Sequence, residues 1–399
     1  MGVVRYANTV ASFLTSYNNW RILLAEFNKR VYLRTYLEQH TTKDQLRSLH
    51  HGVRWLLHSM ALGSDRGSGT YYFTTGWTSS YPETTGYIIP TLLRYSKSRL
   101  AEPQWAKESA EAAQLAGQWL LSIQNEDGGW PGGYVHQQRP SVVFNTGQIL
   151  RGLLALYEHT NEPHWKDAAA RAIDWIWLQM NDRGQFASND FMSAIRVYGT
   201  YVVAPILDWS VHFPDRRNLW EQKAQLHLEW VLTQQNDLGW FANCDNTLHR
   251  NNRPIIHTLA YTIDGMWCAA LSLDDQKYRD SALLPARVLA TEFLQRGILS
   301  GRYNEQWQGT EAFLPTGGAQ LAIVWHSMYI HTGELLWKEA RDRMNQLLSV
   351  IAQRNARESL DTAGAQAGSF PIWGRYEPFA LPNWATKYTV DTLLNGLEN

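Results

Sequence analysis

A short signature of glycine, any residue and an aromatic residue recurs six times in this chain of 399 residues. Successive glycines are 55 to 67 residues apart, and the six copies are Gly69-Thr-Tyr71, Gly128-Gly-Trp130, Gly184-Gln-Phe186, Gly239-Trp-Phe241, Gly301-Arg-Tyr303 and Gly368-Ser-Phe370. Self-similarity at a period of this size is typical of a fold that stacks one supersecondary unit against the next. The repeat therefore indicates six copies of one unit.

Two kinds of helical segment alternate around these glycines. The segment before a glycine mixes apolar and charged residues with helical periodicity, which predicts an outer helix with one buried face. The segment after each glycine is apolar nearly all round and predicts an inner helix at residues 84–96, 145–160, 198–209, 257–273, 316–332 and 384–394. A single pair cannot bury its apolar face alone, so six pairs predict an all-α ring of six helical hairpins, an (α/α)6 toroid.

The repeat also sets the expected domain organisation. Residues 44–399 hold all six copies and are predicted to form a single toroid domain, because repeat toroids grow by adding pairs around one shared core. Residues 1–43 precede the first pair and read as additional helix. We expect them to form an N-terminal extension packed on the ring.

Composition excludes several classes of partner. The 36 basic and 37 acidic side chains leave a net charge of −1, and no basic stripe is present that would neutralise nucleic-acid phosphates. No segment approaches the length of apolar chain that spans a bilayer. The two cysteines, Cys244 and Cys268, have no spacing typical of a disulfide framework or a zinc module. We expect a cytoplasmic protein with no cofactor, no metal, no nucleic-acid partner and no membrane insertion.

One copy of the repeat carries a more specific pattern. The stretch Ala116-Gly117-Gln118-Trp119-Leu120, with Gln124, Gly128 and Trp130, resembles the QW repeat of the squalene-hopene and oxidosqualene cyclases. In those families the Gln caps a helix and stacks on a Trp. Weaker copies run from Trp175 to Phe186 and from Trp230 to Trp240. The resemblance implies a helical toroid and does not transfer a function.

The catalytic residues of the non-carbohydrate toroids are missing. A terpene cyclase of this kind needs an Asp-x-Asp-Asp acid, whereas the nearest string, at residues 272–275, is Ser-Leu-Asp-Asp. Protein prenyltransferases need an Asp-x-Cys zinc ligand pair and lanthionine cyclases need a Cys-His pair, and neither is found. The chain is therefore more similar to the toroids that process carbohydrates, which include six-hairpin glycosidases, unsaturated-uronyl hydrolases, polysaccharide lyases and sugar epimerases.

Candidate catalytic residues gather at the starts of the predicted inner helices, where the loops of a ring converge on its axis. His257, Tyr261 and Asp264 are spaced i, i+4 and i+7 and would share one face of an apolar helix. Glu83 falls in the first turn of another inner helix, and Glu377 lies in the loop before the last one. The same positions also suit a polar ladder between helices or a favourable helix terminus.

Substrate-binding residues are expected in the same loops and first turns. The sequence is rich in Trp and Tyr, with 19 of each, and these side chains offer flat surfaces with a hydrogen-bonding edge. The candidates are Trp77, Tyr87, Trp130, Asn145, Gln148, Trp240, Gln320, Trp373, Arg375, Tyr376, Trp384 and Lys387. Many of the Trp residues could equally pack helix against helix, and Asn145 could be a helix cap.

These patterns favour an enzyme that acts on an oligo- or polysaccharide in the central funnel. Glycosidic hydrolysis needs two carboxylates in different environments, for which Glu83, Asp264 and Glu377 are available. The alternative is a uronate lyase or C5-epimerase with His257 and Tyr261 as base and acid, and Arg375 as a clamp on the carboxylate. A terpenoid cyclase or prenyltransferase-like enzyme and a non-catalytic glycan-binding toroid are further alternatives.

Overall fold

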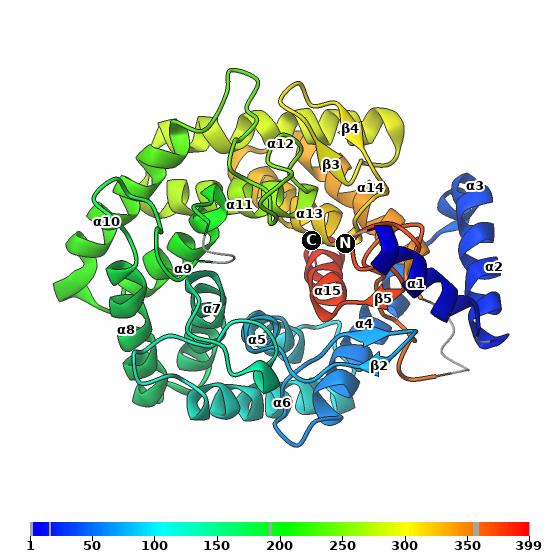
Figure 1. Cartoon of the computed structure of the whole chain (residues 1–399), viewed down its shortest axis with the longest axis horizontal. Coiled ribbons are helices and arrows are strands. Elements are labelled where there is room, and N and C mark those ends of the chain that lie inside the picture. The colour runs from blue at the N-terminus through cyan, green and yellow to red at the C-terminus, as the bar shows by residue number, and fades with distance from the viewer. Residues whose placement is uncertain (1–2, 16, 191–193, 354–358, 399) are drawn as a thin grey trace.

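The helices form a closed double ring (Figure 1). The computed structural model describes residues 3–15, 17–190, 194–353 and 359–398. The inner ring consists of α5 (Pro82–Lys97), α7 (Val143–Thr160), α9 (Thr200–Ser210), α11 (Ile256–Leu273), α13 (Pro315–Thr332) and α15 (Asn383–Leu397). The outer ring consists of α4 (Thr42–Ala61), α6 (Pro103–Ser122), α8 (Pro163–Leu178), α10 (Pro214–Leu232), α12 (Gln276–Arg296) and α14 (Leu335–Ile351).

Neighbouring inner helices contact one another in chain order, and α15 contacts both α13 and α5. The sixth pair joins α15 to α4, so the ring closes between segments that are far apart in the sequence. This confirms the predicted all-α (α/α)6 toroid. Pro stands in the first turn of several ring helices, such as Pro82, Pro103 and Pro163, where its fixed φ suits a helix start and its missing N–H costs nothing.

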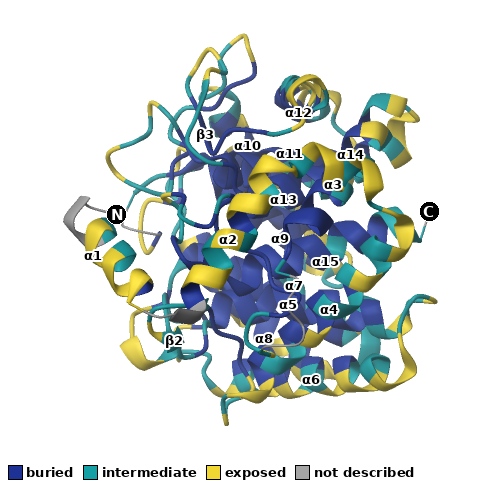
Figure 2. Ribbon diagram, turned by 90° about the vertical axis from the view of Figure 1, so that its right-hand side faces the viewer, coloured by how far each residue is buried: buried dark blue, intermediate teal, exposed yellow. Residues whose placement is uncertain are grey.

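Burial separates the two rings as the sequence predicted (Figure 2). The inner helices are buried on nearly every side over their N-terminal halves, whereas the outer helices expose one face. Small residues let the inner helices approach closely. A Cβ at Gly86 of α5 would lie 2.7 Å from the Cα of Ile149 on α7, so only glycine fits at this crossing.

The glutamines of the repeat join successive outer helices. The side-chain amide of Gln124 donates to the carbonyl of Gly128 (2.8 Å) and to that of Ala168 on α8 (3.0 Å). Gln235 makes the equivalent bonds to Gly239 and to Ser281 on α12, at 3.1 and 2.9 Å. Each Gln therefore closes its own turn and fixes the next hairpin, which explains its recurrence.

Short strands tie the loops together at the end of the ring where the inner helices begin. Strands β1 (Tyr71–Tyr72), β2 (Gly76–Trp77) and β5 (Ala380–Leu381) form one antiparallel sheet in the order β2-β1-β5. Strands β3 (Arg302–Tyr303) and β4 (Gly309–Thr310) form a second. Two 3-10 helices, η1 (Val135–Gln137) and η3 (Val197–Gly199), lie in neighbouring loops. The first sheet connects the loop before α5 to the loop before α15.

Three N-terminal helices lie beside the ring: α1 (Val3–Leu14), α2 (Tyr17–Val31) and α3 (Leu33–Gln39). The ring of Phe13 stacks on Phe379 with centroids 4.1 Å apart. Glu26 accepts a hydrogen bond from the backbone N–H of Ile372 (3.0 Å). Both contacts support the loop between α14 and α15. The division into residues 1–43 and 44–399 stays a prediction, although α4 begins close to it.

Among the described residues, every helix is too short or too polar to cross a bilayer.

Candidate active site

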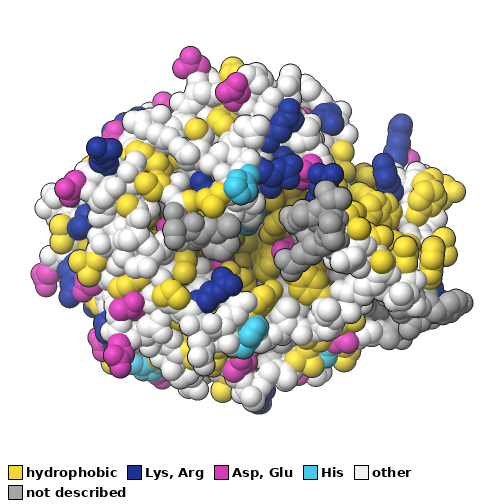
Figure 3. Space-filling model, in the orientation of Figure 1, with side chains coloured by type: hydrophobic (Ala, Val, Ile, Leu, Met, Phe, Trp, Pro, Cys, Tyr) yellow, Lys and Arg dark blue, Asp and Glu magenta, His cyan; other side chains and the backbone are white. Residues whose placement is uncertain are grey.

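A cavity of about 300 Å³ opens at the end of the ring where the inner helices begin. Figure 3 shows the hollow in the middle of this face, with hydrophobic side chains on its walls. Eight of its seventeen lining residues are aromatic. The full lining is Tyr81, Glu83, Thr84, Tyr87, Gly133, Tyr134, Gln137, Arg139, Phe144, Tyr198, Asn246, His257, Thr258, Tyr261, Tyr376, Glu377 and Trp384.

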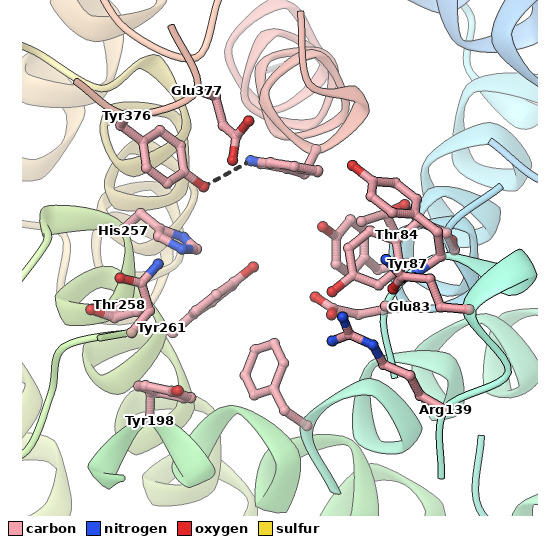
Figure 4. Close-up of a pocket in the computed structure, with 17 residues that line it drawn as sticks. Glu83, Thr84, Tyr87, Arg139, Tyr198, His257, Thr258, Tyr261, Tyr376 and Glu377 are labelled. Atoms are coloured by element: carbon pink, nitrogen blue, oxygen red, sulfur yellow. Dashed lines mark hydrogen bonds between the residues drawn. The ribbon is translucent and has the colours of Figure 1, made fainter. Parts of the chain in front are cut away.

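The α11 wall carries His257, Thr258 and Tyr261 (Figure 4). Burial lowers the pKa of His257 to about 4, although the nearby Asp245 acts to raise it, so the imidazole is neutral at pH 7. Its buried Nδ1 has no hydrogen-bond partner among the described residues. The rings of His257 and Tyr261 are 4.8 Å apart. A neutral imidazole with an unused nitrogen is able to accept a proton.

The opposite wall comes from α5 and carries Glu83 and Tyr87. Glu83 is 8 % exposed, and burial raises the pKa of its carboxyl to about 7, against a smaller lowering by a hydrogen bond from Tyr81. The helix N-terminus favours the anion, but the loss of solvent decides the balance. Glu83 is therefore a carboxyl group that holds its proton near neutrality.

Glu377 enters the cavity from the loop before α15. Tyr72 of β1 donates a hydrogen bond to Glu377 Oε2, and the pairing of Tyr72 with Ala380 on β5 brings the two side chains together. Burial raises the pKa of Tyr72, and the adjacent Glu377 raises it further, so the phenol stays protonated. A Cβ at Gly368 would lie 2.6 Å from the Cβ of Glu377. The sixth glycine of the repeat thus leaves space for the backbone and Cβ of Glu377.

Tyrosines form the inner end of the cavity. Tyr87 and Tyr261 line it, and the Tyr388 hydroxyl behind them lies 3.2 Å from the Tyr201 hydroxyl and 3.5 Å from that of Tyr261. The Arg151 guanidinium carbon is 3.9 Å from the centre of the Tyr201 ring. The phenols therefore separate the cavity from charged groups deeper in the ring.

Asp264 and Lys387 belong to that deeper layer and do not line the cavity. Asp264 accepts a hydrogen bond from Cys268 Sγ (3.4 Å), and Lys387 pairs with Asp391 at 2.8 Å. Asp264 lies seven residues beyond His257, which is about 10 Å further along the helix axis at 1.5 Å per residue. The i, i+7 spacing therefore puts it on the right face but beyond the tyrosines.

Of the predicted site residues, the structure brings seven together in the cavity: Glu83, Tyr87, His257, Tyr261, Tyr376, Glu377 and Trp384. Trp384 donates its indole N–H to the Tyr376 hydroxyl at 3.1 Å (Figure 4). Trp373 and Arg375 share the loop of Tyr376 but do not line the cavity, and Arg375 is exposed.

The other predicted binding residues lie outside the cavity lining. Trp130 and Trp240 are buried and donate to backbone carbonyls, of Leu120 at 2.7 Å and of Tyr303 at 3.1 Å. Trp77 donates to Asp361 (2.9 Å).

Three polar candidates are also buried behind the cavity. Gln148 accepts from Arg151 at 3.1 Å. Asn145 and Gln320 are 1 % and 2 % exposed. Burial raises the pKa of Tyr81, and the nearby Asn145 opposes that rise only in part.

Sequence reasoning missed several lining residues. Tyr134, Gln137 and Arg139 come from the loop after the second copy of the repeat, and Tyr81 directly precedes Pro82. Arg139 is the cation of the lining and is exposed at its edge. These residues could have been predicted from the position of their loop at the funnel end. That position makes the aromatic and basic residues of the loop candidates as much as Trp130. Among the described residues, no cluster of three or more His, Cys, Asp or Glu side chains is arranged to hold a metal ion.

Several solved structures that share this architecture are glycosidases. No protein-family model matches the sequence, and no curated protein matches it either. An unsaturated glucuronyl hydrolase specific for heparin is similar with a TM-score of 0.68 and 14% identity, over 89% of this chain and 97% of that one. The unsaturated glucuronyl hydrolase of Bacillus sp. GL1, responsible for the degradation of glycosaminoglycan, gives 0.65 and 13%, over 89% and 96%.

A mutant of the unsaturated glucuronyl hydrolase of Streptococcus agalactiae, complexed with dGlcA-GalNAc6S, gives a TM-score of 0.62 and 10% identity, over 90% of this chain and 94% of that one. At these identities the likeness concerns the fold. It agrees with the (α/α)6 toroid fold, and these structures give no support to the resemblance to terpenoid cyclases.

Proposed function

We propose that this protein hydrolyses a glycosidic bond of an oligosaccharide bound in the central cavity. The observation that carries the proposal is the presence of two carboxyl groups in unlike surroundings on the wall of one aromatic-lined cavity. Glu83 is buried and its pKa is raised to about 7, whereas Glu377 accepts a hydrogen bond from Tyr72. Glycosidases use one carboxyl group as a proton donor and a second as a base or nucleophile.

The chemistry follows from these environments. Protonated Glu83 donates its proton to the oxygen of the leaving group as the glycosidic bond breaks. Glu377 either deprotonates the attacking water or attacks the anomeric carbon itself, and the Tyr72 hydroxyl fixes its orientation. The aromatic walls pack against the faces of sugar rings, and Thr84, Thr258 and Asn246 supply hydrogen bonds to hydroxyl groups.

The similar structures support a choice of first substrate. They are unsaturated glucuronyl hydrolases, one of them complexed with dGlcA-GalNAc6S. Arg139 at the cavity edge is able to pair with a carboxylate or sulfate on such a sugar. Unsaturated glucuronyl disaccharides are therefore the first substrates to test.

The neutral imidazole of His257 favours a second candidate, uronate lyase or C5-epimerase chemistry. His257 would remove the proton next to the uronate carboxylate, and Tyr261 beside it would return one. Because Arg375 lies outside the lining, Arg139 is the residue that would hold the carboxylate in this scheme.

Product analysis separates these functions. The protein is incubated with unsaturated glucuronyl disaccharides, saturated uronic oligosaccharides and neutral oligosaccharides, and products are identified by mass spectrometry and ultraviolet absorption. Hydrolysis adds one water to the substrate, elimination creates a new unsaturated product without adding water, and epimerisation leaves the mass unchanged. We expect hydrolysis that Glu377→Gln abolishes and His257→Gln leaves within a few-fold.

The matched control is Glu126→Gln, which changes an exposed carboxylate in a loop on the same side of the ring. It should retain wild-type activity. If the wild type instead makes an unsaturated or epimerised product, and only His257→Gln abolishes its formation, the second candidate function would replace hydrolysis. Tight binding of a glycan without any product would indicate a binding toroid.

A further inference from the structure

The N-terminal helix α2 carries a continuous apolar stripe on its outer face. The stripe consists of Trp20, Leu24, Phe27 and Val31, which are 51, 63, 57 and 54 % exposed. Their spacing of four, three and four residues keeps them within a narrow band of one helix face, because each residue turns the helix by about 100°. Single exposed apolar residues are ordinary, but four aligned on one helix mark an interaction surface.

The opposite face of α2 is already in use. Glu26 accepts from the backbone N–H of Ile372, and Lys29 Nζ donates to the carbonyls of Ile351 and Ala352 at 2.9 and 3.2 Å. These bonds fix the rotation of α2 about its own axis. The apolar stripe is therefore held outward, away from the ring, and does not turn inward to cover itself.

Basic side chains border the stripe on both sides. At about 100° per residue, Arg21 and Arg30 fall roughly a quarter turn to either side of it, and both are exposed. Tyr32, directly before α3, and Arg34 and Tyr36 in α3 add exposed side chains next to it. In Figure 3 hydrophobic side chains gather on the edge that α2 and α3 form.

The charge of this part of the chain differs from that of the rest. Residues 1–43 contain six Lys or Arg and two Glu, which gives +4. Because the whole chain carries −1, the remaining residues carry −5. A positive segment with an apolar stripe on an otherwise negative protein is complementary to an anionic surface that also has an apolar interior.

We propose that the apolar stripe of α2 docks the protein onto an anionic phospholipid surface, with the helix lying in the plane of the interface. The four apolar side chains enter the boundary between headgroups and acyl chains, Tyr32 and Tyr36 occupy the headgroup level, and Arg21 and Arg30 contact phosphates. The helix lies on the bilayer and does not cross it. The proposal is independent of the reaction in the cavity.

A second copy of this chain is a poorer occupant of the stripe. If two α2 helices packed through their stripes, Arg21 and Arg30 of both copies would border the same seam and repel one another. A lipid surface instead supplies negative charge along the whole length of both borders.

Docking would also fix the orientation of the cavity relative to the bilayer. Figure 2 shows α2 on the side of the ring that faces the viewer, whereas the loops of the cavity end lie to one side. With α2 on a bilayer, the ring would stand on its edge, and its central axis would run along the surface.

Vesicle flotation tests the proposal with the full chain. The protein is mixed with vesicles of phosphatidylcholine alone or of equal parts phosphatidylcholine and phosphatidylglycerol, and the fraction that floats is measured. We expect binding to the anionic vesicles only, a decrease as salt is raised, at least a tenfold loss of partitioning in the Leu24→Asn/Phe27→Asn double variant, and a smaller loss in Arg21→Gln/Arg30→Gln.

The matched control is Leu178→Asn/Leu219→Asn, which replaces two leucines that are 79 and 54 % exposed on the outer helices α8 and α10. It should bind as the wild type does, and circular dichroism should show all variants folded. Failure of the wild type to float with anionic vesicles would overturn the proposal. An equal loss of vesicle binding in Leu24→Asn/Phe27→Asn and in Leu178→Asn/Leu219→Asn would also overturn it. A wild-type dimer in light scattering that Leu24→Asn/Phe27→Asn converts to a monomer would also overturn it, because the stripe would then be a protein interface.

Discussion

Replacement of Glu83 by Gln should lower activity and should stabilise the fold relative to the wild type as the pH rises through about 7. Gln keeps the shape of the side chain but cannot donate a proton to the leaving group. General acid catalysis contributes about 10²- to 10⁴-fold, so we expect kcat/KM of Glu83→Gln to fall by about that factor. The same change removes a carboxyl group that is costly to ionise in its buried position.

The size of the stability effect follows from the two pKa values of Glu83. The pKa of a free glutamate side chain is 4.5, and burial raises it to about 7 in the folded protein. At about 1.4 kcal/mol for each pKa unit, the difference corresponds to about 3 kcal/mol. Because the folded-state pKa is the higher one, the stabilisation from this proton is complete below about pH 4.5 and is lost as the pH rises through about 7.

Thermal unfolding of the wild type and Glu83→Gln measures this effect. An unfolding entropy of about 2.1 cal/mol/K per residue over 399 residues converts about 3 kcal/mol into roughly 4 °C. We therefore expect the difference in Tm between Glu83→Gln and the wild type to be roughly 4 °C larger at about pH 8 than at about pH 4.5. Comparing the two pH values cancels any constant effect of burying Gln. Glu126→Gln, at an exposed position, should show no such change.

Two results would refute this reasoning. A Tm difference that does not change with pH would mean that Glu83 is not a buried carboxyl group with a raised pKa. Full activity of Glu83→Gln on a substrate that the wild type cleaves would mean that the proton donor is another group.

Two further predictions concern the surroundings of the cavity. Tyr72→Phe should lower kcat at least tenfold with little change in Tm, because it removes the hydrogen bond that orients Glu377; wild-type kcat would show that the bond has no role in the reaction. Asp245→Asn should destabilise the fold by about 3–5 kcal/mol in urea unfolding, because Asp245 is fully buried against Arg302 at 2.7 Å. Asp274→Asn, at a side chain that is 87 % exposed, is the control and should unfold as the wild type does.

The ring could be predicted from the sequence because its signal is repeated. Each inner helix is apolar nearly all round, and α7 and α11 end at the predicted residues, Thr160 and Leu273. The glycines marked the loops for a physical reason, as Gly368 shows by the contact that a Cβ would make with Glu377. A helix buried on both sides needs apolar residues all round, and a close backbone approach needs glycine, so both can be recognised in local sequence.

The depth at which a side chain lies along the axis of the ring could not be predicted in the same way. His257, Tyr261 and Asp264 share a helix face, yet only the first two line the cavity, because the phenols of other helices close it at that level. The side chain of Trp130 looked like a sugar platform, but its indole N–H binds the carbonyl of Leu120 inside the wall. The depth of a side chain depends on phenols from helices far apart in the sequence, and the role of Trp130 depends on how its side chain folds back onto the helix end ten residues before it.

Tyr72 is a residue of the proposed site that the sequence did not predict. Nothing local to Tyr72 indicates a role, and its partner Glu377 is 305 residues later. The two meet because β1 pairs with β5. A pairing register between two-residue strands leaves no periodic pattern in the sequence from which it could be deduced.

The pairing of α4 with α15 sets the order of events during synthesis of the protein. The other five hairpins join helices that are adjacent in the chain, so each is able to form as it leaves the ribosome. The sixth hairpin has to wait for α15, and the sheet that holds Tyr72 beside Glu377 has to wait for β5, which directly precedes α15. Until then α4 and α5 expose apolar surface at one side of an open arc and α13 exposes it at the other. A nascent chain that stalls before α15 would therefore be both inactive and prone to capture by chaperones.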